Sequence, residues 1–236
     1  MLRLPLRGTQ GTVEIRPSKI IAVGLNYREH VTESQVFDLK KLEVPSEPVL
    51  FAKTPNVLIG PGESIVLPAI MYSYNFPSPR VDHEAELAVV IGKRGKNISE
   101  ERALEHVFAY TCFNDVSQRD IQKMDASGWF RGKSFDSFGP LGPELVRPQD
   151  LGDPGKLAIS CRVNGEVKQR ASTADMIFSV AQLIAFISRN FTLEEGDIIA
   201  TGTPSGVSPL KEGDLVEVEI ENIGILQNPV TREVLR

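Results

Sequence analysis

Short apolar runs separated by turn-forming residues constrain this fold more than any other feature of the sequence. Most runs are bounded by Gly, Pro, Asn or Asp, as is typical of strands joined by turns. Strands are predicted at KIIAVGLN (19–26), EPVLFAKT (47–54), ESIVLP (63–68), AELAVVIGK (85–93), VFAYTCFNDV (107–116), KLAISCRVNGEVKQ (156–169), DIIATGT (197–203), DLVEVEIENIGIL (214–226) and PVTREVL (229–235). Within 156–169, Asn164-Gly165 supplies the positive φ angles of a two-residue hairpin turn. The chain is therefore predicted to be mainly β.

Few segments have helical periodicity. Helices are predicted at SEERALEHV (99–107), with Ser99 as a possible N-cap, at DMIFSVAQLIAFISRN (175–190) and over the short segment REHVTES (28–34). This order does not match the alternation of a doubly wound α/β sheet. We predict an α+β fold, mainly β, built as a mixed-strand β roll or sandwich. With no repeat and no linker, residues 1–236 are predicted to form a single catalytic domain, in which residues 1–17 are a short N-terminal strand region.

Charge and hydropathy exclude several classes of partner. The formal net charge is −5, and no basic run offers a surface for a phosphate backbone, so nucleic acid is not expected to bind. No run of about 18 apolar residues exists, and the first residues lack the features of a signal peptide. No membrane partner is expected, and we predict a cytoplasmic protein. Cys112 and Cys161 lie inside apolar runs and are predicted to be buried thiols, as in a reducing compartment.

The most informative segment is VDHEAELAVVIG (81–92). Side chains alternate along a strand, so Glu84 and Glu86 project from one face with their Cα atoms about 6 to 7 Å apart. Two like charges at the start of a buried apolar run require a cation, and hard oxygen ligands favour Mg²⁺, Mn²⁺ or Ca²⁺ over zinc. The alternative is an exposed strand end. Asp82 shares their face by period and is considered a neighbouring acid, not a ligand.

A further acidic residue, Asp115, terminates the apolar run FAYTCF, where sites are often built. It is a candidate third carboxylate ligand, or alternatively the cap of the turn or short helix VSQRDIQ (116–122). On that turn Arg119 and Gln122 offer a guanidinium and an amide to an anionic substrate.

Two later segments carry polar groups in apolar or glycine-rich surroundings. Lys133 in WFRGKSFD lies among aromatic residues, and desolvation there would make it a good stabiliser of developing negative charge. An exposed lysine is the alternative. In the stretch GDIIATGTPSG, the hydroxyl of Thr203 and the free backbone N–H groups are candidates to bind a carboxylate, unless this is an ordinary Gly-Pro loop.

Taken together, these segments resemble the fumarylacetoacetate hydrolase family. The matching pieces occur in family order: IIAVGLNYREHVTE, PVLFAKTPNVLIGPGESIVLP, VDHEAELAVVIGKRGKNISEERALEHVFAYTCFNDVSQRDIQ, WFRGKSFDSFGPLGP, VNGEVKQRASTADMIFSVAQLIAFIS and LEEGDIIATGTPSGV. The layout is closest to the short acylpyruvate hydrolase and hydroxyhepta-diene-dioate isomerase members. The resemblance implies the β roll of the family's C-terminal domain, a homodimer, and Mg²⁺ or Mn²⁺ in the pocket, with Ca²⁺ as a possible substitute in a crystal. The larger members carry an N-terminal domain, which this chain is expected to lack.

The resemblance also implies roles for individual residues. The E-x-E motif assigns Glu84 and Glu86 as metal ligands, and the N-D-V-S motif assigns Asp115 as the third. Lys133 in RGKSFD matches the lysine that faces the substrate.

Other matches concern the substrate and a mobile segment over it. The residues that match positions contacting the carboxylate end of the substrate are Arg119, Gln122 and Thr203. In GLNYREHVTE, His30 and Glu33 match a His-Glu pair of the acylpyruvate hydrolases, and their spacing lets the carboxylate orient the imidazole. His83 and His106 are predicted to be structural.

The favoured hypothesis is hydrolysis of a C–C bond in an acylpyruvate-type 2,4-dioxo acid, such as fumarylpyruvate or acetylpyruvate. A divalent cation would stabilise the enolate of the departing pyruvate unit, Lys133 would support it, and His30 would activate water. The alternative keeps the enolate and changes its fate: decarboxylation or tautomerisation of oxaloacetate, or isomerisation of a diacid such as 2-hydroxyhepta-2,4-diene-1,7-dioate from aromatic compound catabolism. A third possibility is a catalytically silent module that binds a metal or an oxo acid.

Overall fold

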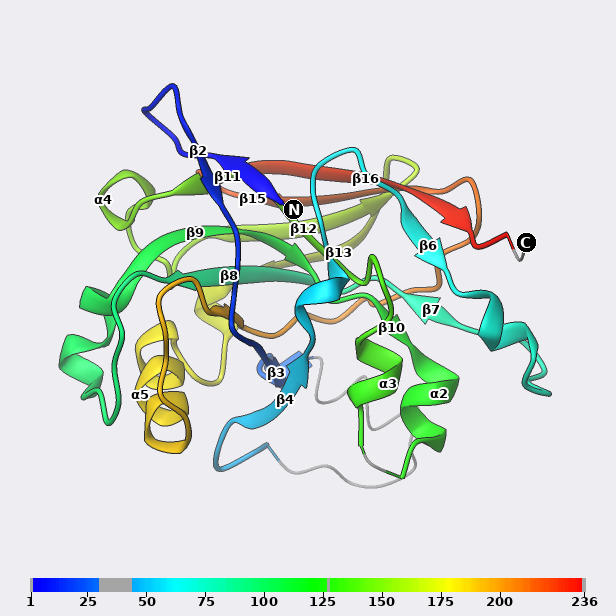
Figure 1. Ribbon diagram of the computed structural model, residues 1–236, viewed down its shortest axis with the longest axis horizontal. Helices are drawn as coiled ribbons and strands as arrows, with labels where there is room; N and C mark the ends of the chain where they lie inside the picture. Colours follow the sequence, from blue (N-terminus) through cyan, green and yellow to red (C-terminus); the bar gives the residue numbers. More distant parts are fainter. Residues whose placement is uncertain (1, 30–43, 127, 235–236) are drawn as a thin grey trace.

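Strands form most of the regular structure of the computed structural model, which describes residues 2–29, 44–126 and 128–234 (Figure 1). The strands are β1 Arg3–Pro5, β2 Thr12–Glu14, β3 Ile20–Gly24, β4 Val49–Lys53, β5 Leu58–Ile59, β6 Ile65–Leu67, β7 Val81–Asp82, β8 Ala85–Ile91, β9 Val107–Asn114, β10 Ser117–Gln118, β11 Gly139–Val146, β12 Ala158–Val163, β13 Glu166–Ser172, β14 Ile198–Ala200, β15 Leu215–Ile220 and β16 Gly224–Arg232. The α-helices are α2 Arg119–Met124, α3 Phe130–Lys133, α4 Pro148–Leu151 and α5 Val180–Asn190. Short 3₁₀ helices are η1 Pro55–Val57, η2 Ala69–Tyr72, η3 Glu100–His106 and η4 Thr173–Asp175.

The larger sheet contains seven strands in the order β4-β3-β14-β8-β9-β11-β5. Strand β14 pairs parallel with β3 and antiparallel with β8, so segments near the two ends of the chain lie side by side in the middle of the sheet. Every residue of β8 is buried, as expected for an apolar run that packs on both faces. The pair β8–β9 forms the centre from which the candidate site is built.

The second sheet has five strands in the order β13-β12-β15-β16-β6. The predicted hairpin is confirmed, since β12 and β13 pair antiparallel and both Asn164 and Gly165 have positive φ. Residues of both sheets contribute to one hydrophobic core. This arrangement of curled mixed sheets with few helices is the predicted mainly-β roll.

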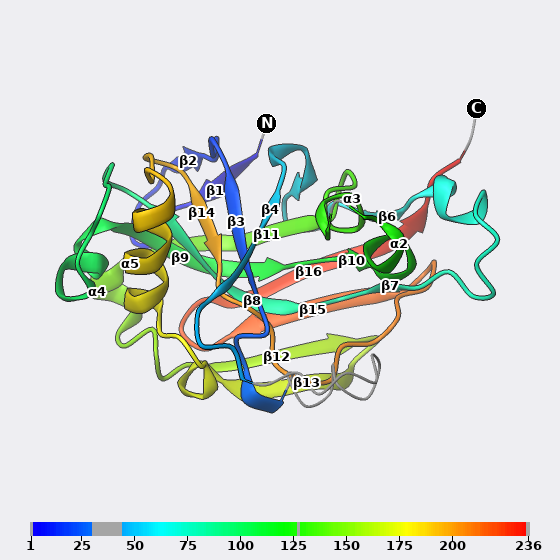
Figure 2. The ribbon, with the colours of Figure 1, turned by 90° about the horizontal axis from the view of Figure 1, so that it is seen from below.

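Helices lie at the two ends of the molecule. Both views place α5 at one end and the pair α2–α3 at the other, with β3 and β4 between them (Figures 1 and 2). Helix α5 starts at a capping box in which Ser179 and Gln182 exchange hydrogen bonds. None of the helices in the described parts of the chain has both the length and the apolar character needed to cross a membrane.

Some local predictions were wrong. The helix predicted at 99–107 is present as the 3₁₀ helix Glu100–His106, but the Ser99 side chain does not cap it. The helix predicted from 175 begins only at Val180, because the Ser179 cap sets its start. Strand β11 was not predicted, because its sequence GPLGPELV has the glycines and prolines of a loop. It pairs with β9 through an irregular register between Gly142 and Val146.

Candidate metal centre

Three acidic side chains meet where β8 begins and β9 ends. Glu84 precedes β8, Glu86 lies within it, and Asp115 follows β9 directly. The backbone continues the ladder at this point: the Asp115 N–H donates to the Glu84 carbonyl oxygen (2.9 Å), and the Glu84 N–H donates to Asn114 Oδ1 (2.9 Å). One carboxylate oxygen from each acid lies within 4.8 Å of the others, and all three residues are buried. The sheet register therefore produces a compact oxygen cluster suited to a divalent cation.

Asp115 lies between two buried lysines. Lys53 Nζ is 2.6 Å from Asp115 Oδ1, and Lys133 Nζ is 2.6 Å from Asp115 Oδ2. Lys133 also contacts Glu84 Oε2 at 2.8 Å, whereas Lys53 donates a second hydrogen bond to the Val116 carbonyl oxygen (3.3 Å). Both oxygens of Asp115 thus face an ammonium group, and one of these groups is shared with Glu84.

The two lysines differ in acidity for a physical reason. Burial lowers the pKa of Lys53, and the single carboxylate of Asp115 does not outweigh this effect. Burial acts on Lys133 as well, but Asp115 and Glu84 together raise the pKa of Lys133 above its ordinary value. Of the two lysines, Lys133 is therefore the more firmly protonated.

Arg119 closes the other side of Glu84. Its Nε donates to Asp82 Oδ2 (2.8 Å), its Nη1 donates to Gln122 Oε1 (3.1 Å), and its Nη2 forms an ion pair with Glu84 Oε1. Burial opposes the charge of Arg119, but Glu84 and Asp82 raise its pKa. A guanidinium has five N–H groups, so Arg119 retains donors for a ligand beyond these contacts. Asp82, considered a neighbouring acid from the sequence, orients this guanidinium.

Glu86 differs from the other two acids because no ion pair joins it to a cation within the described residues. Its Oε2 accepts a hydrogen bond from the Gly202 N–H (2.9 Å), and its exposed fraction is 1%. Burial raises the pKa of Glu86 well above its ordinary value, and the charges of Asp115 and Glu84 raise it further. A buried carboxylate in these surroundings fits a divalent cation, because the positive charge would favour the ionised form of Glu86 and offset the repulsion from Asp115 and Glu84.

A second unsatisfied group lies near the same cluster. The Tyr27 hydroxyl is buried and, within residues 2–29, 44–126 and 128–234, has no hydrogen-bond partner. Burial raises the pKa of Tyr27, and Glu86 is the largest charge acting on it. A buried hydroxyl normally has a partner, so this atom also fits a site that receives a ligand.

Thr203 lies in the loop after β14, next to the residue that binds Glu86. Its Oγ1 accepts a hydrogen bond from Gln169 Nε2 of β13 (2.8 Å). Gln169 Oε1 lies 3.0 Å from His83 Nδ1, and His83 Nε2 lies 2.8 Å from Ser208 Oγ. His83 is thus held in a neutral network, in agreement with its predicted structural place, and burial lowers its pKa.

The remaining site predictions have different outcomes. His30 and Glu33 lie outside the described residues, so their pairing stays a prediction. His106 contacts the backbone through Nδ1 to the Lys93 carbonyl oxygen (2.9 Å), away from the cluster. The predicted desolvation of Lys133 is confirmed, since its exposed fraction is 2%. The aromatic surroundings differ in detail, because Phe130 is 48% exposed and the ring near the Lys133 ammonium is that of Phe51, 4.9 Å away.

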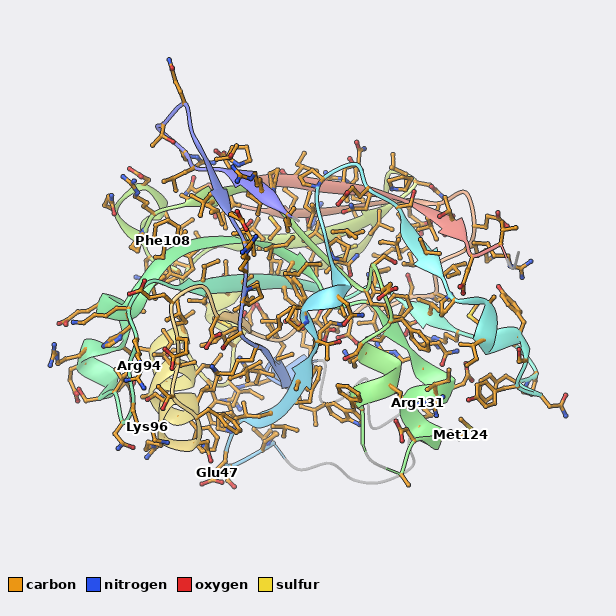
Figure 3. The ribbon with its side chains drawn as sticks, viewed as in Figure 1. Glu47, Arg94, Lys96, Phe108, Met124 and Arg131 are labelled. Carbon is orange, nitrogen blue, oxygen red and sulfur yellow. The ribbon has the colours of Figure 1, made fainter. Side chains whose placement is uncertain are left out.

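The helices α2 and α3 have one buried side and one side exposed to solvent. Lys133, the last residue of α3, is buried, whereas Met124 at the end of α2 is 46% exposed. Met124 and Arg131 lie at the outer surface of this helix pair (Figure 3). The two helices pack closely because residue 132 is glycine. Any larger residue would place its Cβ 2.7 Å from the Gln122 backbone nitrogen, which is too close.

Sequence reasoning missed Lys53, Gln169 and Tyr27 as members of the site. The only local signal for Lys53 is a charged residue at the end of the apolar run VLFA, and a strand end is often exposed. Gln169 lies in a hairpin whose other polar residues face solvent, and Tyr27 in GLNYREH is one aromatic residue among several. For none of the three does the spacing in the sequence differ from that of an ordinary surface or core residue.

Comparison with known proteins gives a consistent match over the chain. The family model described as "Fumarylacetoacetate (FAA) hydrolase C-terminal" matches residues 19–231. A mitochondrial oxaloacetate tautomerase of Bos taurus is 46% identical over 224 residues, which cover 91% of this chain and 67% of that protein.

Solved structures of enzymes named for other reactions are also similar to this chain. A 5-carboxymethyl-2-hydroxymuconate delta-isomerase from Mycobacterium smegmatis superposes with a TM-score of 0.81 at 41% identity, covering 94% of this chain and 81% of that chain. A maleylpyruvate hydrolase from Sphingobium sp. SYK-6, in complex with manganese(II) and pyruvate, superposes with a TM-score of 0.76 at 33% identity, covering 92% and 72%. The similar proteins therefore include a tautomerase, an isomerase and a hydrolase.

Proposed function

This chain belongs to the fumarylacetoacetate hydrolase family, and we propose that it is a divalent-metal-dependent enzyme that forms the enolate of small 2-oxo acids. One observation carries the proposal: a buried ammonium, Lys133, lies against two of three clustered carboxylates. When bound to Glu84, Glu86 and Asp115, Mg²⁺ or Mn²⁺ would supply Lewis-acid stabilisation of negative charge on a substrate oxygen. The manganese and pyruvate in the similar hydrolase support this choice of ion and ligand class.

The residues around the carboxylates provide what enolate formation requires. Removal of a proton from the carbon next to the 2-oxo group places negative charge on the oxo oxygen, and the protonated Lys133 is positioned to stabilise it. The remaining N–H groups of Arg119 and the amide N–H groups of Gln122 are donors for the substrate carboxylate. Thr203 follows Gly202, whose N–H binds Glu86, and it offers a hydroxyl to the substrate from a different segment than Arg119 and Gln122.

We favour tautomerisation or isomerisation as the fate of the enolate. These reactions move a proton and require no attacking water. The charged residues described above can bind the substrate carboxylate and stabilise the enolate, which both reactions need. The 46% identity to an oxaloacetate tautomerase and the 41% identity to a muconate isomerase support this choice. Decarboxylation of oxaloacetate belongs to the same candidate group, because loss of CO₂ from the keto form breaks the C3–C4 bond and leaves its electrons on the pyruvate unit as an enolate, which is then protonated.

Hydrolysis of a C–C bond in an acylpyruvate is the second candidate. The likeness to a maleylpyruvate hydrolase and the His30-Glu33 pair in the sequence favour it. In this reaction His30 would take a proton from water, which would attack the distal carbonyl, and the bond to the pyruvate unit would break with its electrons remaining on that unit. Lys133 would serve both candidates in the same way.

A substrate panel separates the candidates. Oxaloacetate, acetylpyruvate, fumarylpyruvate and 2-hydroxyhepta-2,4-diene-1,7-dioate are assayed with Mg²⁺ and with EDTA, reading enol absorbance and pyruvate release in parallel. We expect turnover of at least one compound, lost in EDTA. Turnover unaffected by EDTA in protein shown to be metal-free would contradict the proposal.

The variant His30→Ala then assigns the reaction. Retained enol–keto conversion with unchanged Mn²⁺ binding favours tautomerisation or isomerisation, because those reactions do not need activated water. Loss of pyruvate release from an acylpyruvate with unchanged Mn²⁺ binding favours hydrolysis. Lys133→Met should abolish both activities, with the exposed Lys123→Met as its matched control.

We also propose that the protein forms the homodimer expected from the family resemblance. Light scattering coupled to size-exclusion chromatography would test it, with a mass near twice the 26.0 kDa of the chain as the expected result. A mass of one chain at micromolar concentration would contradict it.

A further inference from the structure

Gln169 connects the strand that carries Glu84 and Glu86 to the loop that carries Thr203. It lies in β13, and its exposed fraction is only 1%. Its Oε1 accepts from the Ala85 N–H (3.0 Å) and lies 3.0 Å from His83 Nδ1. Its Nε2 donates to Thr203 Oγ1 (2.8 Å) and to the Pro204 carbonyl oxygen (2.8 Å). The amide therefore makes four hydrogen bonds, which is its normal full complement without bifurcation.

Two backbone groups fix the direction of this amide. The Ala85 N–H can only donate, so the side-chain atom that faces it must be oxygen. The Pro204 carbonyl oxygen can only accept, so the atom that faces it must be nitrogen. The ordinary ambiguity between the O and N atoms of a glutamine does not arise here. The backbone thus determines which way the Gln169 dipole points.

The fixed amide determines the role of the Thr203 hydroxyl. Because Gln169 Nε2 can only donate, Thr203 Oγ1 must accept from it, and the hydroxyl proton remains to be donated elsewhere. No acceptor for that proton lies within the parts of the chain that the structure describes, although the exposed fraction of Thr203 is only 3%. Two contacts connect this hydroxyl to the segment that carries the carboxylates: the neighbouring Gly202 N–H binds Glu86 Oε2 (2.9 Å), and Gln169, the partner of Thr203, accepts from the Ala85 N–H (3.0 Å).

Close backbone packing keeps this geometry rigid. Gly206, in the same loop, has a φ of +96°, and a Cβ there would lie 2.1 Å from the Lys168 carbonyl oxygen of β13. The loop can lie this near to β13 only because position 206 is glycine. Gln169 and Thr203 are therefore brought together by the backbone packing of this loop on β13 as well as by their own hydrogen bond.

We propose that Gln169 is a positioning residue that presets the Thr203 hydroxyl as a hydrogen-bond donor to a negatively charged oxygen of the substrate, such as its carboxylate. This inference rests on the proposed function, in which the substrate is a 2-oxo acid. An acceptor oxygen receives a donor that needs no reorientation on binding, which favours a carboxylate over a group that presents N–H donors. The donor and acceptor roles are thus set in series: the Ala85 N–H orients Gln169, Gln169 orients the Thr203 hydroxyl, and this hydroxyl donates to the substrate.

A double-mutant cycle tests the inference. Gln169→Met, Thr203→Val and the double variant are compared in Mn²⁺-loaded protein, with pyruvate as the probe and calorimetry as the measurement of its Kd. Each single variant should weaken pyruvate binding by about 10-fold, the value of one hydrogen bond to a charged group. The double variant should bind no more weakly than Thr203→Val alone, because Gln169 acts through that hydroxyl.

Two readouts separate positioning from a general structural effect. Mn²⁺ affinity should stay within about twofold of wild type in Gln169→Met, and Thr203→Ser, which keeps the hydroxyl, should bind pyruvate nearly as wild type does. On the active substrate of the panel, KM should rise while kcat stays nearly constant, because a carboxylate contact is the same in the ground state and the transition state.

The possible failures are distinguishable. Fully additive losses in the cycle, or wild-type pyruvate binding in Gln169→Met, would overturn the inference and leave the proposed function standing. If wild-type protein neither binds pyruvate with Mn²⁺ nor turns over any compound of the panel, the proposed function fails and this inference fails with it. Should Gln169→Met not fold, Gln169→Glu replaces it. The added charge then acts in both backgrounds of the cycle, so only the part transmitted through Thr203 disappears in Thr203→Val.

Discussion

The two sides of the candidate metal centre are built from different chemistry. The charged side consists of Lys53, Glu84, Asp115, Arg119 and Lys133, which are joined by ion pairs. The neutral side consists of His83, Gln169, Thr203, Pro204 and Ser208, which are joined by hydrogen bonds between uncharged groups. Glu86 lies between the two sides, since it belongs to the carboxylate cluster but accepts a hydrogen bond from the Gly202 N–H.

The charged side is held by the attraction between charges, and the neutral side is held by hydrogen bonds of fixed direction. On the charged side each group depends on the charges of its neighbours, and Glu86 is fully balanced only when a cation comes from outside. On the neutral side the backbone fixes the direction of the Gln169 amide, the partners of Gln169 follow from that direction, and no external ion is needed. We therefore expect metal, pH and charge substitutions to act mainly on the charged side, and the neutral side to respond only to the loss of single hydrogen bonds.

The largest expected effect comes from Lys53→Met on the charged side. Methionine fills the space of the lysine stem but leaves Asp115 with one of its two ammonium partners, in a place with no exposed surface. We expect the metal-free protein to lose about 3–5 kcal/mol of unfolding free energy, measured by urea denaturation in EDTA. Excess Mg²⁺ should reduce the loss. The exposed Lys123→Met is the control, and equal stability of both variants in EDTA would show that the pair with Asp115 is dispensable.

The next effect concerns the acid between the two sides. Glu86→Gln keeps an acceptor for the Gly202 N–H but removes one of three negative charges from the cluster. We expect Mn²⁺ affinity, measured by calorimetry, to fall by at least about 100-fold. Glu212→Gln changes an exposed acid and should leave the affinity unchanged. Wild-type affinity in Glu86→Gln would place the ion elsewhere.

A smaller effect is the pH dependence of the metal-free protein. The folded-state pKa of Glu86 is raised above its ordinary value of 4.5, so the folded protein binds more protons than the unfolded chain above about pH 4.5. Stability is therefore lost as pH rises through the raised pKa, with a slope of at most about 1.4 kcal/mol per pH unit for one proton. Denaturation at several pH values in EDTA should show this slope. It should be weaker in Glu86→Gln and in saturating Mg²⁺, and an unchanged slope in both would exclude Glu86 as its source.

The smallest expected effect lies on the neutral side. Ser208→Ala removes the hydroxyl that faces His83 Nε2 at 2.8 Å. We expect a loss of about 1 kcal/mol in unfolding free energy, with Mn²⁺ affinity and the pH slope unchanged. Ser205→Ala, at a more exposed contact with Glu29, is the matched control. A change of Mn²⁺ affinity in Ser208→Ala would show that the two sides are coupled.

Most of the sheet could be predicted because its core strands are continuous apolar runs. Strands β8 and β9 lie where AELAVVIGK and VFAYTCFNDV indicated, and the Asn164-Gly165 turn fixed the register of β12 and β13. Strand β11 was missed because Gly139, Pro140, Gly142 and Pro143 are loop-forming residues by propensity. Its strand conformation depends on pairing with β9 and β5, which no local pattern contains.

The candidate site was predictable only in part for a similar reason. The spacing of Glu84 and Glu86 indicated a shared face, and the family resemblance added Asp115, which the structure brings to the same cluster. Lys53 and Gln169 were not predicted, because their importance comes from β4 and β13 meeting the cluster in space. The orientation of a single amide is a tertiary property, and composition or spacing does not determine it.

The place of β14 in the sheet also bears on how the protein reaches its native state. Ile198 pairs with Ile20 and with Val90, so the Gly202–Thr203 loop joins the centre only after distant parts of the chain have come together. Contacts of such large sequence separation form slowly and late. The three carboxylates lie on the neighbouring strands β8 and β9, but Glu86 is held by the Gly202 N–H and Asp115 by Lys53 of β4. We therefore expect a divalent ion to bind tightly only after the folding transition state, so that its stabilisation appears in the unfolding rate. We expect Mg²⁺ to lengthen the lifetime of the folded protein without speeding its folding.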